Sequence, residues 1–168
     1  MYIVMTRYGS NFFDIFSNHQ ALFSTKSVYS LGLTLLNILE KIHKAGYVYN
    51  DLKLDNLMLD YGVNIKEMTA GSDDPFEKIT INIIDFGFAT PYVEADGQTH
   101  IQKQRLGTYR GNIIFSSLNQ LKFYSTSRRD DLISLFYLLI YMLKGGEMPG
   151  TNLKEDYDPE KEFSLTLK

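Results

Sequence analysis

The chain contains 168 residues, which is enough for one domain with its own hydrophobic core. Its 17 lysines and arginines against 20 aspartates and glutamates leave a formal net charge of −3, so composition gives no reason to expect nucleic acid as a partner. The absence of cysteine excludes disulfides, thiolate metal sites and a cysteine nucleophile. It also suits a reducing compartment, and we expect an intracellular protein of the cytoplasm, the nucleus or both.

The first third of the chain predicts helices. Residues 1–5 are apolar but short and lack a basic leader, so they indicate a strand end and not a signal peptide. Residues 11–16 predict a short helix. A long helix follows, because six apolar residues recur at spacings of three and four and share one face: Val28, Leu31, Leu35, Ile38, Leu39 and Ile42. Ser24 or Thr25 is expected to cap its start, and Gly46 lies where a C-terminal cap belongs.

The middle of the chain predicts a hairpin and a long loop. Residues 47–61 indicate a loop followed by a strand, and the polar stretch at about 66–78 indicates a hairpin loop with an insertion. The isoleucine-rich residues 79–84 predict the returning strand. Residues 89–121 lack clear periodicity and predict a long functional loop.

The segment at residues 128–144 is helical and apolar nearly all round, which predicts a central buried helix. It contains the longest apolar run of the chain, residues 132–143. A membrane span needs about 20 such residues, and charged residues stand directly before this run. We therefore expect a core helix and no membrane span.

Two short segments carry residues suited to phosphoryl transfer. The first is residues 49–56, Y-N-D-L-K-L-D-N, and the second is residues 84–87, I-D-F-G. Transfer needs a group that orients the attacking hydroxyl, oxygen ligands for magnesium, and a cation near the transferred group. Asp51 suits the first role and Lys53 the third. Asn56 and Asp85 suit the second, because a hairpin between them can bring Asp85 back beside the loop.

The order D-x-K-x-x-N, two apolar strands, then D-F-G resembles the eukaryotic protein kinases. Three further segments resemble the casein kinase 1 and vaccinia-related kinase group. Residues 127–135, S-R-R-D-D-L-I-S-L, are similar to the S-R-R-D-D-L-E-S-L of casein kinases 1, and S-L-N at 117–119 stands in place of their S-I-N. Residues 111–117 resemble the G-T-x-x-[YF]-x-S run, and residues 5–9 resemble the segment after the hinge, so the similarity covers about residues 1–149.

The resemblance implies a protein-kinase-like α+β fold, specifically the C-terminal lobe only, mainly helical with small β-hairpins and with the N-terminal lobe absent. Residues 1–168 would form a partial kinase domain from the hinge through the central helix, with an insertion at about 66–78 and an activation segment at 85–119. The implied activity is transfer of the ATP γ-phosphate to protein serine or threonine with Mg²⁺. No nucleic acid partner is implied.

The resemblance also assigns roles to single residues. Asp51 would be the catalytic base, and Lys53 would contact the γ-phosphate and indicate serine or threonine substrates. Asn56 and Asp85 would bind magnesium and the nucleotide. Asp131 would open the central helix and hold the catalytic loop by hydrogen bonds to its backbone. Two further residues would give structural support beside the metal site: Phe86 and Gly87.

Parts of the kinase pattern do not occur in this sequence. It has no G-x-G-x-x-G loop and no V-A-I-K lysine, which the resemblance would place before Met1. Positioning and electrostatics supply most of phosphoryl-transfer catalysis, so we expect little or no kinase activity from this chain alone. A non-catalytic, pseudokinase-like scaffold is the main alternative. A nucleotide-binding regulatory domain is a third, in which Asp51 would be idle.

Smaller departures concern single positions. Asn50 replaces the usual arginine, which normally pairs with a phosphorylated activation loop, so we hypothesise that activation-loop phosphorylation is not needed. Tyr49 replaces the usual histidine. Ile114 replaces a common arginine, which puts a preference for acidic or primed substrates in doubt. His43, near the end of the long helix, is interpreted as a capping or surface group, because no zinc-site spacing is present.

Overall fold

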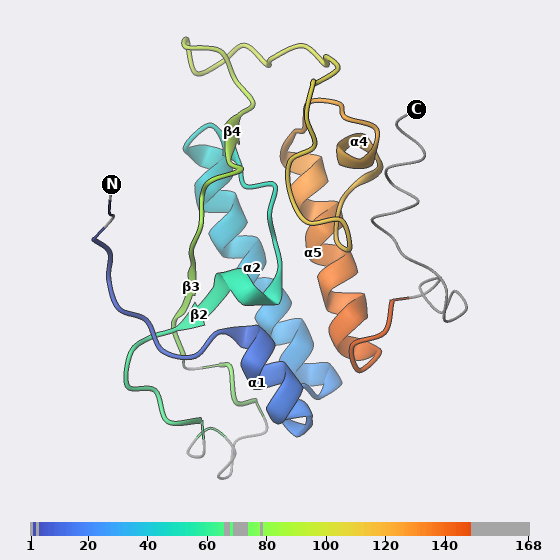
Figure 1. Cartoon of the computed structure of the whole chain (residues 1–168). Helices are drawn as coiled ribbons and strands as arrows, with labels where there is room; N and C mark the ends of the chain where they lie inside the picture. Colours follow the sequence, from blue (N-terminus) through green and yellow to red (C-terminus); the bar gives the residue numbers. More distant parts are fainter. Residues whose placement is uncertain (1, 3, 66–67, 69–73, 78, 149–168) are drawn as a thin grey trace.

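The structure, a computed structural model, describes residues 2, 4–65, 68, 74–77 and 79–148 (Figure 1). The first helix, α1, is Phe12–Asn18, and the Asn11 side chain caps it by accepting a hydrogen bond from the Asp14 backbone at 2.7 Å. This confirms the predicted short helix. A single 3₁₀ turn, η1, follows at Gln20–Leu22. The strand end expected at residues 1–5 is wrong for those described, because 2, 4 and 5 have no strand partner.

The long helix α2 is Thr25–Lys44, close to the predicted bounds. Ser24 caps its start, since its hydroxyl accepts a hydrogen bond from the Ser27 backbone at 3.2 Å. The helix ends at Ala45, and Gly46 follows with a φ of 89°, the left-handed conformation that favours glycine. Four residues of the predicted face are fully buried: Val28, Leu31, Leu35 and Leu39.

Four short strands form two antiparallel pairs. β1, Tyr47–Val48, pairs with β4, Thr90–Pro91. β2, Leu57–Leu59, pairs with β3, Ile81–Ile83, in the register Leu57 to Ile83. A 3₁₀ turn, η2 at Leu54–Asn56, precedes β2. The predicted loop, strand and returning strand are thus confirmed, whereas most of the predicted insertion at 66–78 lies outside the described residues.

The last helices are α4, Leu118–Leu121, and α5, Arg128–Leu143. α5 lies beside α2 (Figure 1), and the two approach so closely that a Cβ on Gly32 would lie 3.0 Å from Leu139. Leu135 and Leu138 are buried, but Phe136 is 61% exposed and Leu132 is exposed as well. The expectation that this helix is buried on every side is therefore wrong for the described part of the chain, in which one face has no cover.

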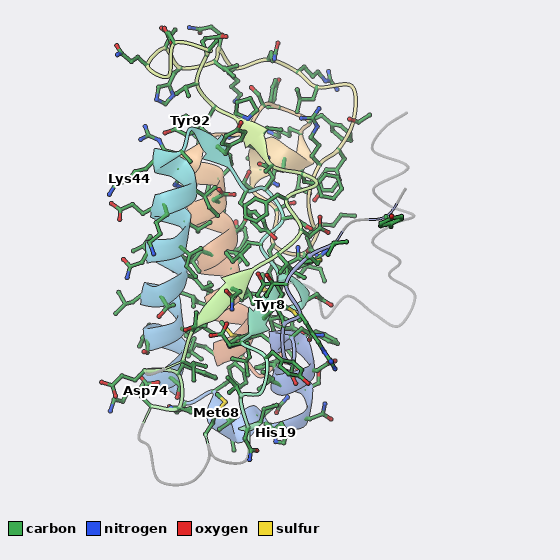
Figure 2. The ribbon with its side chains drawn as sticks, turned by 90° about the vertical axis from the view of Figure 1, so that its left-hand side faces the viewer. Tyr8, His19, Lys44, Met68, Asp74 and Tyr92 are labelled. Carbon is green, nitrogen blue, oxygen red and sulfur yellow. The ribbon has the colours of Figure 1, made fainter. Side chains whose placement is uncertain are left out.

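The hydrophobic core lies between α1, α2 and the β2–β3 hairpin, where Phe12 and Phe76 pack with their ring centroids 5.5 Å apart. Figure 2 shows Lys44 and Tyr92 at one end of the molecule and His19, Met68 and Asp74 at the other. β1, β4 and the start of α5 lie at the first of these ends. Among the described residues, no helix is long and apolar enough to cross a membrane.

Candidate active site

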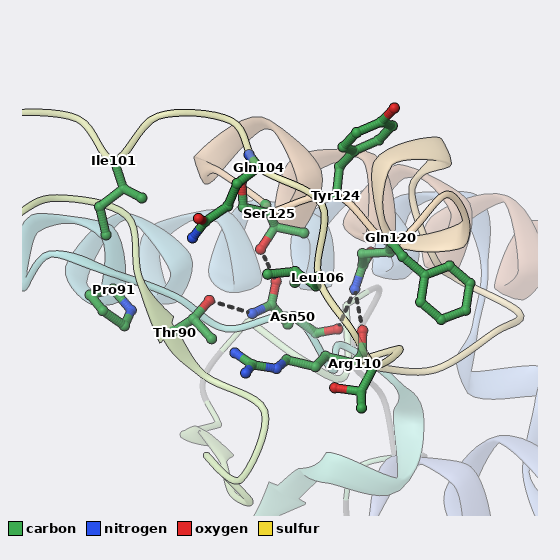
Figure 3. Close-up of a pocket in the computed structure, with 13 residues that line it drawn as sticks. Asn50, Thr90, Pro91, Ile101, Gln104, Leu106, Arg110, Gln120, Tyr124 and Ser125 are labelled. Carbon is green, nitrogen blue, oxygen red and sulfur yellow. Dashed lines mark hydrogen bonds between the residues drawn. The ribbon is translucent and has the colours of Figure 1, made fainter.

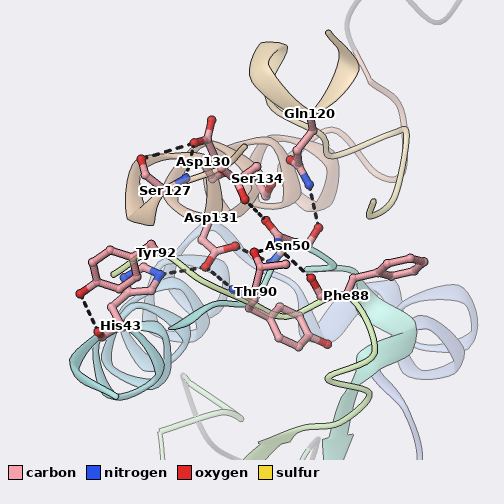
Figure 4. A network of polar contacts seen from close by, with 12 residues as sticks. His43, Asn50, Phe88, Thr90, Tyr92, Gln120, Ser127, Asp130, Asp131 and Ser134 are labelled. Carbon is pink, nitrogen blue, oxygen red and sulfur yellow. Dashed lines mark hydrogen bonds and ion pairs between the residues drawn. The ribbon is translucent and has the colours of Figure 1, made fainter. Parts of the chain in front are cut away.

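The backbone just before Asp51 is held by one buried carboxylate, that of Asp131 (Figure 4). Asp131 is only 1% exposed. Its Oδ1 accepts a hydrogen bond from the Asn50 backbone at 2.8 Å, and its Oδ2 accepts one from the Tyr49 backbone at 2.8 Å. The same Oδ2 lies 2.8 Å from His43 Nε2. A buried carboxylate is stable only when donors surround it, and these three donors fix the turn that carries Asp51.

The first turn of α5 places Asp131 by pairing it with Asp130. Asp130 caps the helix, because its Oδ2 accepts a hydrogen bond from the Ser127 backbone at 2.8 Å. Its Oδ1 accepts from the Ser117 hydroxyl at 2.7 Å and from the Asn119 side chain at 2.9 Å. Two adjacent carboxylates therefore connect the start of one helix to two other segments: Asp130 to α4, and Asp131 to the catalytic loop.

Asp51 lies at the centre of three of the predicted site residues. Its Oδ2 accepts a hydrogen bond from Asn56 Nδ2 at 2.9 Å and lies 3.1 Å from Lys53 Nζ. Its Oδ1 is buried and has no hydrogen-bond partner in the part of the chain that the structure describes. An unpaired buried carboxylate oxygen is costly, and a hydroxyl donor brought to this atom would satisfy it.

Asp85 joins this group through its backbone. The Ile84 backbone donates to the Asn56 carbonyl at 3.0 Å, which places Asp85 directly after a residue bonded to the catalytic loop. Asp85 itself has a φ of 60°, in the left-handed region that aspartate tolerates better than most residues. Its carboxylate is exposed, and its Oδ1 accepts a hydrogen bond from the Gly87 backbone at 3.1 Å. Asp51, Lys53 and Asn56 thus meet through side chains, and Asp85 meets them through the β2–β3 hairpin.

Tyr49 connects the two halves of the site. Its hydroxyl donates to the Ile84 carbonyl at 2.6 Å, and its ring packs edge-on against Phe86 at 5.4 Å between centroids. Burial raises the pKa of Tyr49 well above its ordinary value, and the negative charges of Asp51 and Asp85 add to this rise. One hydroxyl therefore stays protonated and lies within the electrostatic reach of both carboxylates.

The metal-binding capacity of the site rests on few residues. Among the described residues, no three His, Cys, Asp or Glu side chains are arranged to hold a metal ion. Asn56 directs its Nδ2 to Asp51, at 3.0 Å from the carbonyl and 2.9 Å from Oδ2, so its amide oxygen faces away from Asp51. That oxygen and the exposed Asp85 carboxylate are hard ligands of the kind that Mg²⁺ prefers. A metal here would need further oxygens from outside the chain.

Sequence reasoning misplaced His43 and missed its partners. The residue is buried, not a surface or capping group, and its backbone carbonyl accepts a hydrogen bond from the Tyr92 hydroxyl at 2.8 Å. Gln120 was also missed, although its side chain donates to the Asn50 carbonyl at 2.8 Å. No local pattern identifies such residues, because Asp131 stands 88 positions after His43.

Comparison with known proteins agrees with this arrangement of loop, hairpin and helix. Residues 1–162 match the family described as protein kinase domain, so the chain belongs to the protein kinase family. The predicted kinship with casein kinase 1 is confirmed by two relatives. The chain is 35% identical over 131 residues to a probable casein kinase I homolog of Encephalitozoon cuniculi, covering 78% of this chain and 36% of that protein. It is 30% identical over 144 residues to a casein kinase 1-like protein of Oryza sativa subsp. japonica, covering 85% of this chain and 19% of that protein.

Proposed function

We propose that this chain carries the phosphotransfer residues of a protein serine/threonine kinase, within the region that corresponds to the large lobe. The observation that supports the proposal is the asymmetry of Asp51: Asn56 and Lys53 hold its Oδ2, while its buried Oδ1 has no partner among the described residues. A carboxylate fixed by one oxygen and open at the other can receive a substrate hydroxyl and orient it.

The other residues divide the remaining work. Lys53 lies close enough to Asp51 to place a positive charge beside the attacked phosphorus. Asn56 and Asp85 would hold Mg²⁺, and ATP bound with that metal would supply the phosphoryl group. The similarity to casein kinase 1 relatives favours protein serine and threonine as acceptors. The activation segment would run from Asp85 to residue 119.

A non-catalytic scaffold remains the second candidate. Two observations favour it for this chain: the sequence contains no G-x-G-x-x-G loop, and Phe86 beside the proposed metal ligand is 53% exposed. A scaffold would bind partners through the same fold without using Asp51. The polar residues at positions 51, 53, 56 and 85 favour the catalyst over the scaffold, because a scaffold has no need for them.

Thermal unfolding of residues 1–168 tests the binding half of the proposal. Ligand at 100 times its dissociation constant stabilises a protein by about 2.7 kcal/mol, so ATP with Mg²⁺ should raise the melting temperature and ATP without Mg²⁺ should raise it less. Asp85→Asn should remove the part that depends on Mg²⁺, whereas Asp96→Asn, an equal charge change on an exposed turn, should keep it. No shift that depends on Mg²⁺ would contradict the metal site.

Phosphate transfer tests the catalytic half. Any transfer to serine or threonine of a protein substrate by the wild-type chain should fall at least about a hundredfold in Asp51→Asn, because general base catalysis contributes that much or more. Equal transfer by Asp51→Asn would contradict the role of Asp51. Binding of ATP and Mg²⁺ with no transfer would favour a nucleotide-binding regulatory domain, and neither binding nor transfer would favour the scaffold.

A further inference from the structure

Asn50, directly before Asp51, uses its whole side chain to join three segments (Figures 3 and 4). Its Nδ2 donates to the Phe88 carbonyl at 2.8 Å and to the Thr90 hydroxyl at 2.9 Å. Its Oδ1 accepts a hydrogen bond from the Thr126 hydroxyl at 2.6 Å. The residue is buried, so both amide hydrogens and the amide oxygen are used inside the protein.

The backbone carbonyl of Asn50 adds a fourth connection. Gln120 Nε2 donates to it at 2.8 Å and also to the Arg110 carbonyl at 3.2 Å. Gly111 lies against the same carbonyl: it has a φ of 118°, and a Cβ there would come within 2.4 Å of the Asn50 oxygen. We call residues 88–126 the connecting segment, since they join the D-F-G motif to α5. Asn50 therefore meets this segment at its start, at its middle through Gln120, and at its end.

Every one of these contacts is between neutral groups. The cavity beside Asn50 has a volume of about 210 Å³, and Arg110 provides the single charge among the described residues that line it (Figure 3). The φ of 70° at Asn50 lies in the left-handed region, where asparagine is among the most tolerated residues after glycine. Neither the backbone nor the hydrogen bonds at this position call for an added phosphate.

We infer that Asn50 is a positioning residue that anchors the connecting segment to the catalytic loop through uncharged hydrogen bonds, without phosphorylation of the segment. The consequence for catalysis rests on the proposed function, because it matters only if Asp51 acts on a substrate that lies along this segment. The anchoring itself is a property of the fold. It predicts that local order in the connecting segment depends on the Asn50 amide and not on phosphate.

Hydrogen–deuterium exchange of the whole 168-residue chain measures this order directly. Asn50→Asp keeps the size of the side chain and the acceptor for Thr126, but it turns the donor toward the Phe88 carbonyl into a second acceptor. Backbone amides of the connecting segment should then exchange about tenfold faster or more, since a buried hydrogen bond is lost and an acceptor is left unpaired. Asn37→Asp makes the same chemical change on the exposed side of α2 and should leave the segment as in the wild type.

Two further measurements keep the inference testable if Asn50→Asp does not fold. Thr126→Val removes one donor to Asn50, and exchange of the segment should rise severalfold while α2 stays protected; Thr126→Ser should restore wild-type exchange. Treatment of the wild-type chain with a broad-specificity protein phosphatase should change nothing.

The inference is overturned if Thr126→Val and Asn50→Asp exchange like the wild type, or if phosphatase treatment loosens the segment as much as they do. None of these readouts needs nucleotide or phosphate transfer. A failure of the proposed kinase activity would therefore leave the result of this experiment unaffected.

Discussion

The two halves of the candidate site differ in how firmly the chain holds them. On the catalytic-loop side, Asp51 and Asp131 are each 1% exposed and hydrogen-bonded to several donors. On the D-F-G side, Asp85 is exposed, and Phe86 packs against Tyr49 with half of its surface open. The chain itself thus preorganises the group that would orient a hydroxyl, while the group that would hold a metal rests on a short hairpin and one tyrosine.

This contrast follows from what each half is attached to. The catalytic loop is bonded to the first turn of α5, a helix of four turns that packs on α2. The D-F-G motif follows β3, a strand of three residues with one partner strand. Rigid elements fix side chains more closely than loops do, so substitutions on the two sides should differ in their effect on stability.

Removing the Asp131 carboxylate should have the largest effect. Asp131→Ala leaves the His43 side chain and the backbone N–H groups of Tyr49 and Asn50 without their buried acceptor. We expect a loss of about 3–5 kcal/mol in the free energy of unfolding, the cost of breaking a buried charged network by removing one partner. Urea unfolding followed by circular dichroism measures it.

Asp131→Asn is the matched variant, because it keeps the size and one acceptor oxygen. It should lose clearly less stability than Asp131→Ala. Equal stability of the wild type and Asp131→Ala would mean that the catalytic loop is held by something other than this carboxylate, and the contrast between the two halves would disappear.

A methyl group at Gly111 should disturb the catalytic-loop side from the opposite direction. Gly111→Ala forces a side chain into a φ of 118° and brings its Cβ within 2.4 Å of the Asn50 carbonyl. We expect a loss of about 2 kcal/mol or more, because an unfavourable backbone conformation alone costs about 1–3 kcal/mol. In Gly107→Ala the added Cβ meets nothing within 4 Å, and unfolding in urea should show a change of less than about 1 kcal/mol.

Loss of the Tyr49 hydroxyl should show a pH dependence of defined sign. At neutral pH, Tyr49→Phe leaves the Ile84 carbonyl unpaired and should cost about 1–2 kcal/mol. The folded protein raises the pKa of Tyr49, so the unfolded chain loses its proton first as pH rises above about 10. Stability from this group is complete below that pH and falls above it by about 1.4 kcal/mol per pH unit.

The difference in unfolding free energy between the wild type and Tyr49→Phe should therefore narrow above pH 10. Urea titrations at several pH values between 7 and 10.5 give this difference. Tyr29→Phe, on the exposed side of α2, is the matched control for the loss of one hydroxyl. A gap that widens with pH would contradict the direction of the pKa shift.

Phe86 should give the smallest effect and so marks the open half. Because Phe86 is 53% exposed, Phe86→Ala should cost less than about 1 kcal/mol, whereas Phe12→Ala, at a fully buried ring, should cost about 3–5 kcal/mol. Thermal and urea unfolding of both variants test this. A large loss from Phe86→Ala would show that the D-F-G side is held as firmly as the catalytic loop.

The sequence predicted the elements whose signals are local. The periodic apolar face of α2, the Ser24 cap and the isoleucine-rich β3 all follow from spacing and residue type within a few positions. The motif residues of the site were found because their order and spacing resemble those of a large family. Their convergence could be expected only from the hairpin that joins Asn56 to Asp85.

The sequence did not predict what depends on distant contacts. The buried state of His43 follows from Asp131, and the role of Gln120 follows from Asn50, both far along the chain. The exposed ring of Phe136 was missed for a related reason: an apolar helix predicts burial, but what covers each face depends on segments that pack against it. Composition alone cannot say which face is covered.

The β2–β3 hairpin also separates chain length from site geometry. Asn82 Nδ2 donates to Asp60 Oδ1 at 2.7 Å, and the paired strands continue from there to Asn56 and Ile84. The chain between residues 60 and 82 leaves the hairpin at the end of the molecule opposite Tyr92, where Met68 and Asp74 lie (Figure 2). An epitope tag or a fluorescent label inserted there would report on the protein from a point remote from Asp51, with the strand pairing left to keep Asn56 and Asp85 in register.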